Sequence, residues 1–281
     1  MNGAEFMDLY QKSGVFLKEP DEVNLHHGCP NRFVCWEGSE NIDKFGASWN
    51  RIQKPYIGLE YSGELLVVGL NLNTYGGWGC LDGLFWGEND SKGVIEYIRQ
   101  GKKRIDFNSA HYFGTILFHR IAVYSSILID HLSFKDQSTL SSGEIRTLHN
   151  DKDNLSNVLK KIAYTNAIKC SPNWHLSTPT GGMKEICPSF FLVSEIKILK
   201  PRSILLLNKI TFDLLTQRYA LESTGINEGM ANYSRLSVDG HQCDLFRILH
   251  PTARKGRSFR AGNSLANTQD LYSLKQKISQ W

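Results

Sequence analysis

Four short apolar runs along the chain predict buried strands. Each run is rich in Leu, Ile and Val and lacks the alternation of a half-exposed strand, which is typical of parallel strands covered on both faces. Segments with apolar residues at helical spacing separate the runs, and this alternation predicts a parallel sheet with helices on both faces. The four predicted strands are residues 64–70 (ELLVVGL), 162–168 (IAYTNAI), 203–209 (SILLLNK) and 244–250 (DLFRILH).

The segments between and after the strands predict four helices. One of them begins with Pro188 in its first turn and ends before Lys200 and Pro201, because proline favours the first turn of a helix and stops a helix elsewhere. Residues 134–157 are polar and rich in Ser, Asp and Asn, so they predict a loop between the first helix and the second strand. The predicted helices are residues 110–132, 187–199, 211–219 and 266–278.

These elements predict an α/β fold, a three-layer α/β/α sandwich around a central four-stranded, mostly parallel sheet. Residues 61–281 carry the strong periodic patterns and form the expected core. Residues 1–60 carry few such patterns, so we expect them to wrap around that core within a single compact domain. The chain has 281 residues, of which 41% are apolar, and this is enough for one sizeable core.

Charge and cysteine content narrow the classes of function. The formal net charge of +4 is compatible with a polyanionic partner but far below that of a histone-like tail. No stretch approaches the ~20 apolar residues of a membrane span, and the first residues lack the apolar segment of a secretory signal. We therefore expect a cytoplasmic monomer. In that compartment the six cysteines are more often free, metal-bound or catalytic than paired in disulfides.

Polar side chains stand at the end of each predicted strand. In an open parallel sheet the ligand crevice lies outside the carboxyl ends of the strands, so Asn71, Asn166, Asn208 and His250 are expected to line one pocket. Asparagine and histidine are also common in turns and helix caps, and this alternative stays open for each residue taken alone.

Four short motifs follow one another along the chain: GLNLN (69–73), YTNAIKC (164–170), residues 187–208 and HPT (250–252). In order and spacing they resemble the motifs of the uracil-DNA glycosylase superfamily, and most closely those of its iron–sulfur branch. In that branch a glycine motif, a strand ending in Asn-x-x-Lys-Cys, a cysteine before a helix and a His-Pro-Ser motif follow one another. The resemblance covers roughly residues 25–260 and implies the α/β fold of that superfamily.

The resemblance implies a role for each matched residue. Asn71 stands where the superfamily places the group that positions the attacking water, and His250 stands where it places the histidine that stabilises charge during cleavage. Asn166 matches the amide that hydrogen-bonds the flipped base, and Phe85 or Trp86 matches the aromatic ring that stacks on that base. For the two aromatic residues, packing in a core is an equally good interpretation.

A glycosylase must stabilise charge and must reach its base. Cleavage of an N-glycosidic bond builds positive charge on the sugar and negative charge on the base, so the site needs fixed donors and a held water. The base must also leave the duplex. The expected DNA contact is the basic loop with Arg254, Lys255 and Arg257, in which Arg254 is the inserted side chain; a solvated basic turn is the alternative.

Four cysteines match the ligands of a metal cluster. The resemblance implies that Cys170 and Cys187 are the last two ligands of a 4Fe-4S cluster and that Cys29 and Cys35 are the first two, with zinc as the alternative metal. The first pair is more widely spaced than the Cys-x-x-Cys of the family, so either His26 or His27 is an alternative ligand. At the start of a predicted helix, the thiolate of Cys187 is favoured by the helix dipole. Buried, reduced cysteines without a metal are the alternative.

Departures from the family motifs bear on the substrate. Asn73 stands where uracil-specific relatives use a tyrosine that blocks substituents at C5, and the glycine-rich residues 75–87 let the backbone withdraw from a ligand. An open C5 side resembles what anti-phage members of the superfamily need to excise glucosylated hydroxymethylcytosine. The expected activity is therefore that of a monofunctional DNA glycosylase that excises such a modified cytosine from phage DNA and leaves an abasic site.

Three alternatives stay open. The first is a uracil-DNA glycosylase of base excision repair. The second, from another class, is a non-catalytic DNA-binding protein on the same fold, and the third is a hydrolase of free nucleosides. Lys169 lies next to the motif residues, but a supporting or phosphate contact is a more common role for such a lysine than a Schiff-base nucleophile.

Overall fold

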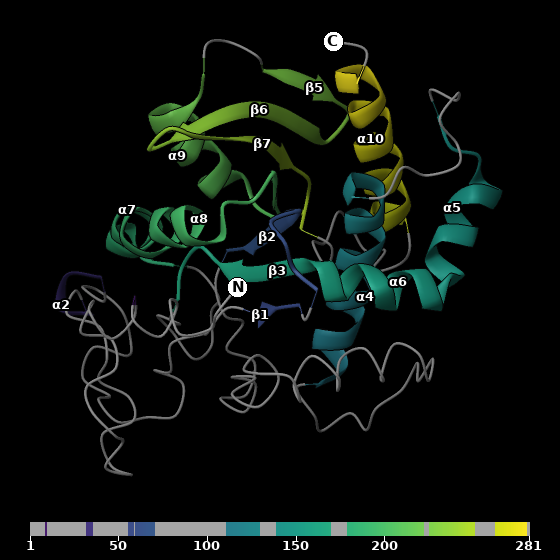
Figure 1. Cartoon of the computed structure of the whole chain (residues 1–281), viewed down its shortest axis with the longest axis horizontal. Coiled ribbons are helices and arrows are strands. Elements are labelled where there is room, and N and C mark those ends of the chain that lie inside the picture. The colour runs from purple at the N-terminus through teal and green to yellow at the C-terminus, as the bar shows by residue number, and fades with distance from the viewer. Residues whose placement is uncertain are drawn as a thin grey trace.

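The described part of the computed structural model is built around one seven-stranded sheet, in the order β1-β3-β2-β4-β7-β6-β5 (Figure 1). The strands are β1 (Tyr56–Ile57), β2 (Leu65–Gly69), β3 (Ile162–Asn166), β4 (Ser203–Leu206), β5 (Ile226–Glu228), β6 (Ala231–Val238) and β7 (His241–Arg247). The structure describes residues 9, 32–35, 56–58, 60–70, 111–129, 139–169, 179–221, 225–250 and 262–279.

The four predicted strands form the centre of this sheet, and the sheet is larger than expected. β2 pairs in parallel with β3 and with β4, and β4 pairs in parallel with β7. The expectation of a four-stranded, mostly parallel sheet is wrong in extent, because antiparallel strands extend both edges. β1 joins β3 on one side, and β6 and β5 follow β7 on the other.

The strands β6 and β7 form a hairpin that the apolar pattern did not identify. Its two loop residues, Asp239 and Gly240, have φ values of 49° and 80°, as a type I′ turn requires. An Asp-Gly pair between two strands is a strong sequence signal for this turn. β6 was missed because it mixes buried with half-buried and exposed positions, so it contains no continuous apolar run.

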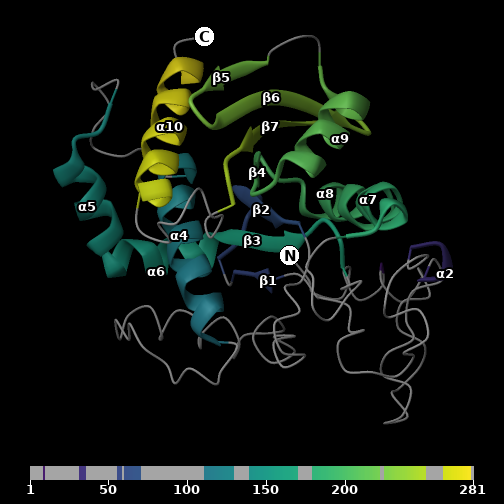
Figure 2. The ribbon, with the colours of Figure 1, turned by 180° about the vertical axis from the view of Figure 1, so that it is seen from behind.

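Helices cover both faces of the sheet (Figures 1 and 2). Leu65 and Val67 of β2 pack in one core with α4, α5, α6 and α10, whereas Leu66 and Val68 pack in the other with α7, α8 and α9. Alternate residues of one strand therefore supply two cores, which produces the predicted three layers. The helices are α2 (Arg32–Cys35), α4 (His111–Ile129), α5 (Ser142–Asn150), α6 (Lys152–Lys161), α7 (Gly181–Cys187), α8 (Val193–Leu199), α9 (Lys209–Tyr219) and α10 (Gly262–Ser279).

The segment predicted as a polar loop, residues 134–157, instead contains α5 and most of α6. Ser141 and Glu144 form a capping box at the start of α5, and the Asp151 side chain caps α6 by accepting from the N–H of Asn154. Each helix also buries an apolar face in the first core. The Ser and Asp residues that indicated a loop are therefore helix caps.

The helix predicted from residue 187 begins earlier. Its N-terminal part, α7, is capped by the Thr180 side chain, which accepts from the N–H of Met183. Pro188 lies inside the continuous helical segment, at the start of a π-helical turn (Pro188–Leu192) in which the N–H of Val193 bonds the Pro188 carbonyl. The wider turn allows the helix to continue even though Pro188 has no N–H to donate. The segment ends at Leu199, as predicted.

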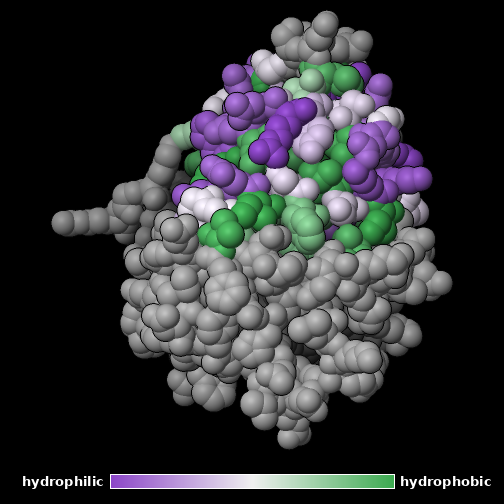
Figure 3. Space-filling model, turned by 90° about the vertical axis from the view of Figure 1, so that its left-hand side faces the viewer, coloured by the Kyte–Doolittle hydropathy of each residue, from purple (hydrophilic) through white to green (hydrophobic). Residues whose placement is uncertain are grey.

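Outside the sheet, the described residues give a partial view of the N-terminal segment and of the surface. Most of residues 1–60 lies outside the described part, so the wrap around the core stays a prediction; α2 packs against α7. In Figure 3 hydrophilic and apolar residues mix over the described surface, and apolar residues are densest along the lower margin of the coloured region. Within the described ranges, no helix is both long enough and apolar enough to cross a membrane.

Candidate functional site

The carboxyl ends of the four central strands lie at one edge of the sheet. Backbone hydrogen bonds continue the pairing past the strand ends, from the N–H of Ala167 to the Gly69 carbonyl at 3.0 Å and from the N–H of Ile248 to the Leu206 carbonyl at 3.0 Å. Neighbouring strands are about 4.8 Å apart, so the edge from β3 to β7 spans about 14 Å.

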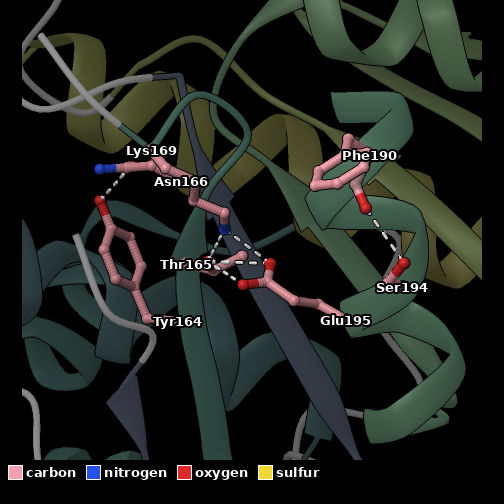
Figure 4. Close-up of polar contacts among 7 residues, drawn as sticks. All are labelled: Tyr164, Thr165, Asn166, Lys169, Phe190, Ser194 and Glu195. Carbon is pink, nitrogen blue, oxygen red and sulfur yellow. Dashed lines mark hydrogen bonds and ion pairs between the residues drawn. The ribbon is translucent and has the colours of Figure 1, made fainter. Parts of the chain in front are cut away.

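Asn166 ends β3 at this edge, and its amide is held by neighbours on the sheet. The Tyr164 hydroxyl donates to Oδ1 of Asn166 at 3.0 Å, and both side chains are buried (Figure 4). On the next strand, Gly69 pairs in register with Asn166. A Cβ at Gly69 would lie 2.1 Å from Oδ1 of Asn166 and 2.7 Å from the Tyr164 hydroxyl, so only glycine leaves room for both oxygens.

A buried ion pair lies on the opposite face of β3. Nζ of Lys169 is 2.7 Å from Oε2 of Glu195 on α8, and the two side chains are 1% and 0% exposed. The Thr165 hydroxyl accepts from Lys169 and donates to Glu195 at 3.1 Å, so the three side chains form one network (Figure 4). A charge pair without water needs such additional hydrogen bonds. Lys169 therefore holds the end of β3 against α8.

Asn208 follows β4 at the same edge, and it caps a helix. Its Oδ1 accepts from the N–H of Thr211 at 2.7 Å, which makes it the N-cap of α9. The alternative role that sequence analysis left open, that of a helix cap, is therefore confirmed for Asn208. Its Nδ2 is buried and has no hydrogen-bond partner in the described part of the chain.

His250 follows β7 and is largely screened from solvent. Burial, with a smaller effect from the positive charge of Arg120 on α4, lowers the pKa of His250 to about 4. The imidazole is therefore neutral near pH 7, with one N–H donor and one acceptor nitrogen. The preceding residue is anchored, because the buried Asn267 side chain donates from Nδ2 to the Leu249 carbonyl at 3.0 Å.

Two further histidines lie on the α4, α5 and α10 side of the sheet. Nε2 of His119 is 2.9 Å from the His149 carbonyl, and Nε2 of His149 is 3.4 Å from the Thr268 hydroxyl. Burial lowers the pKa of both histidines, that of His149 to about 4, and the charge of Arg120 acts in the same direction. Arg120 thus lowers the pKa of three histidines, one in α4, one in α5 and one just after β7.

Two of the predicted metal ligands are described, and they share one apolar cluster. Cys35 and Cys187 are both buried in the core on the α7 side, together with Met183. The Thr180 hydroxyl donates to the Cys35 carbonyl, which fixes α2 against the start of α7. Contrary to the expectation, Cys187 ends α7 within a continuous helical segment, so the helix dipole does not favour its thiolate.

Cys35 and Cys187 are the members of the predicted ligand set that the structure describes, and both are buried thiols. Cys170 directly follows Lys169, whose partner Glu195 lies about two helical turns after Cys187, so the ion pair joins the two segments that carry the last two predicted ligands. Within the described residues, no group of three metal-ligating side chains occurs. Cys243, which matches no ligand position, is an ordinary buried thiol with its pKa raised to about 12, first by burial and then by Asp244.

Several predicted site residues stay predictions because they lie outside the described residues. Among the residues that are described, the structure adds partners that sequence analysis missed. The alternation of a strand places Tyr164 on the same face as Asn166, and Arg120 is the one Lys or Arg of an otherwise largely apolar α4; both signals were available. The predicted residues outside the described ranges are Asn71, Asn73, Phe85, Trp86, Arg254, Lys255, Arg257, Cys29 and Cys170.

Comparison with known proteins assigns no function to the chain. No protein-family model matches the chain, and no curated protein matches its sequence. Two of the predicted site residues, Asn166 and His250, lie at the carboxyl ends of β3 and β7, at one edge of the parallel part of the sheet.

Proposed function

We propose that this protein is a monofunctional DNA glycosylase that excises a flipped, modified pyrimidine and leaves an abasic site. The observation that carries the proposal is the placement of a hydroxyl-bound amide, Asn166, and a neutral imidazole, His250, at the carboxyl edge of one parallel sheet. Asn71 follows Gly69 of the adjoining strand by two residues. Three polar groups from strands far apart in the chain then serve one nucleotide.

The proposed chemistry separates charge across the glycosidic bond. The departing base gains negative charge, which donors from Asn166 and His250 stabilise. A neutral imidazole suits this role, because it donates a hydrogen bond without repelling the positive charge that develops on the sugar. Asn71 holds the attacking water as an orienting group rather than as a strong base.

The state of Lys169 supports hydrolysis over a Schiff-base mechanism. An amine nucleophile must reach the sugar, whereas the amine of Lys169 is 1% exposed and paired with Glu195. Flipping the base costs a few kcal/mol. Contacts between phosphates and the basic loop with Arg254, Lys255 and Arg257 offset this cost in the proposal.

A 4Fe-4S cluster, or alternatively zinc, has a structural role in this proposal. Cys29, Cys35, Cys170 and Cys187 would hold it, and two of them already share one apolar cluster beside α7. A four-thiolate centre binds segments that are distant in the chain. None of the proposed steps at the base requires electron transfer.

The test is a panel of duplexes that differ in a single base. We propose glucosylated hydroxymethylcytosine as the substrate, so purified protein should create alkali-labile sites in duplexes that contain it. The panel also contains cytosine, hydroxymethylcytosine and uracil, and the alkali step is omitted in parallel to detect lyase activity. Cleavage at uracil alone would replace the proposed substrate by uracil. Absence of base release from every duplex, with DNA binding retained, would support the non-catalytic DNA-binding protein.

A further inference from the structure

Buried polar atoms without a hydrogen-bond partner gather around the start of α9. Among the described residues four such atoms occur, and three of them are Nδ2 of Asn208, Oγ1 of Thr211 and Nε of Arg247. The fourth, Oγ of Ser125, lies on α4. Buried polar groups in proteins nearly always have a partner, so three unpaired donors in one region indicate a group that binds there.

The sheet and α9 bring these three side chains together. α9 packs on β4, β6 and β7 (Figure 2). Asn208 follows β4 by two residues, and Arg247 ends β7 in register with Leu206 of β4. Leu206 and Leu245 face the core on the α9 side, so Arg247, two residues after Leu245, faces the same side. Burial lowers the pKa of Arg247 and the charge of Asp213 on α9 opposes that effect, which agrees with this placement.

Thr211 lies in the first turn of α9 and points toward the start of the helix. It is the third helical residue, and side chains of an α-helix lean toward its N-terminus. Thr211 is 1% exposed, and its hydroxyl has no partner. By contrast, the Thr216 hydroxyl on the same helix donates to the Phe212 carbonyl at 2.8 Å, as a helical threonine commonly does. The Thr211 hydroxyl therefore stays available to a ligand at the helix start.

The charges in this region favour an anion. The first N–H groups of a helix have no acceptor within the helix, and the helix dipole places its positive end there. Arg247 adds a full positive charge; its Nη1 donates to Oδ1 of Asn232 at 2.6 Å, and it forms no ion pair with a described residue. The first turn of α9 contains no acidic residue, and Asp213 further along pairs with the exposed Lys209.

We propose that the start of α9 binds a terminal phosphate group, either inorganic phosphate or the monoester of a nucleotide, through the side chains of Asn208, Thr211 and Arg247. The amide NH2, the hydroxyl and the guanidinium N–H all donate hydrogen bonds, and a phosphate accepts on several oxygens at once. The helix start supplies the favourable dipole. This inference goes beyond the proposed glycosylase function and does not depend on it.

The burial of the donors favours a terminal phosphate over a phosphate inside a DNA strand. The unpaired atoms are closed to solvent, whereas the side chains of Asn208 and Arg247 as a whole are only half-buried and can turn toward an entering ligand. A monoester phosphate is attached at one oxygen, so its three free oxygens enter first and meet donors on several sides. A diester has two free oxygens, one negative charge and chain on both sides, which keeps it at the surface.

The experiment is isothermal titration calorimetry of the full chain at constant ionic strength. The monoester probes are inorganic phosphate and thymidine 5′-monophosphate, and the diester probes are dimethyl phosphate and an unmodified DNA duplex with hydroxyl ends. Thr211→Val removes the hydroxyl and keeps the shape, and the variant should fold because that hydroxyl has no partner to lose. Thr216→Val is the matched control, since its hydroxyl is satisfied within α9.

We expect wild type to bind inorganic phosphate, Thr211→Val to bind it about tenfold more weakly and Thr216→Val to bind it as wild type does. Arg247→Gln should weaken binding by about tenfold or more, and it decides the question if Thr211→Val does not fold. Binding of the nucleotide without binding of inorganic phosphate would support the site and identify the nucleotide as the source.

Three results would overturn the inference. The first is wild-type protein that binds neither monoester probe at millimolar concentration, and the second is a folded Thr211→Val protein with wild-type affinity. The third is binding of the diester probes alone, which would assign the donors to the DNA backbone. None of these measurements uses base release, so the proposed function stands or falls separately.

Discussion

Lys169 and Glu195 form an ion pair that is closed to solvent on both sides, with Nζ 2.7 Å from Oε2 and exposed fractions of 1% and 0%. The pair joins the strand-end motif of β3 to α8 through Thr165. Removing one charge leaves the other buried without its counter-charge, which costs about 3–5 kcal/mol. The pair is therefore expected to be more important for keeping the motif in place than for net stability.

The first prediction concerns this pair. Lys169→Met should lower the free energy of unfolding in urea by about 3–5 kcal/mol, whereas Lys169→Met with Glu195→Leu should recover most of the loss because no charge stays buried. Lys209→Met is the control, since Lys209 forms an exposed pair with Asp213 and should change stability by less than about 1 kcal/mol. A Lys169→Met protein as stable as wild type would contradict the buried pair.

The second prediction concerns the space above Gly69. Gly69→Ala places a Cβ on the Asn166 and Tyr164 oxygens, so we expect a loss of about 1–3 kcal/mol in urea unfolding and weaker binding of the base. Gly181→Ala is the matched control, because no described atom lies within 4 Å of the added Cβ. Equal stability of the two variants would show that the Asn166 amide does not lie over Gly69.

The central strands were predictable because each is a continuous apolar run. β6 was not recognised, since a strand that mixes buried with half-buried and exposed positions gives no such run, although Asp239 and Gly240 marked its turn. The helices α5 and α6 were mistaken for a loop because their caps, Ser141 and Asp151, use residues that are also typical of loops.

The candidate site was predictable only at the level of strand ends. Asn166 was chosen because it is the polar residue near the end of an apolar run, and it is buried at the end of β3. The surroundings of its amide include Tyr164 of the same strand and Gly69 of the neighbouring strand. A local sequence pattern does not show which distant segments pair, so the contact with Gly69 could not be predicted. The lowered pKa of His250 likewise depends on burial and, to a smaller extent, on the charge of Arg120, and both depend on how distant segments pack.

The third prediction is a loss of stability in mild acid. Native pKa values of about 4 for His149 and His250, against about 6.5 in the unfolded chain, mean that the unfolded chain binds more protons between these values. The stabilisation is fully present above pH 6.5 and is lost as the pH falls toward 4, by up to about 1.4 kcal/mol per pH unit for each histidine. Urea unfolding at pH 7.0, 6.0 and 5.0 measures the slope.

The variant His149→Gln should reduce that slope, because glutamine keeps a polar side chain but does not titrate. The comparison stays above pH 5, where the titration of carboxylates such as Glu64, whose pKa is lowered, contributes less. A slope in His149→Gln equal to that of wild type would contradict a depressed pKa at His149.

The fourth prediction separates the cysteines. If Cys187 is a cluster ligand, Cys187→Ser should abolish stoichiometric iron and sulfide in protein purified without oxygen, or stoichiometric zinc if zinc is the metal. Cys243→Ser is the control, since Cys243 is equally buried but matches no ligand position, and it should retain the full metal content. Wild-type protein without bound iron or zinc would refute the cluster and leave ordinary buried cysteines.

The fifth prediction compares His250, which follows β7, with the histidine at the start of that strand. His250→Gln should slow base release by about 10²–10³-fold, because the donor to the departing base is displaced, while DNA affinity stays within about twofold of wild type. His241 lies at the other end of β7, where its Nε2 is 2.9 Å from the Pro201 carbonyl, so His241→Gln should leave base release unchanged. Single-turnover rates on the accepted duplex measure the effect. Because the pKa of His250 is about 4, wild-type rates should show no loss of activity from protonation of this residue between pH 8 and pH 6. Full activity in His250→Gln would remove the imidazole from the proposed mechanism and leave Asn166 as the proposed contact to the base.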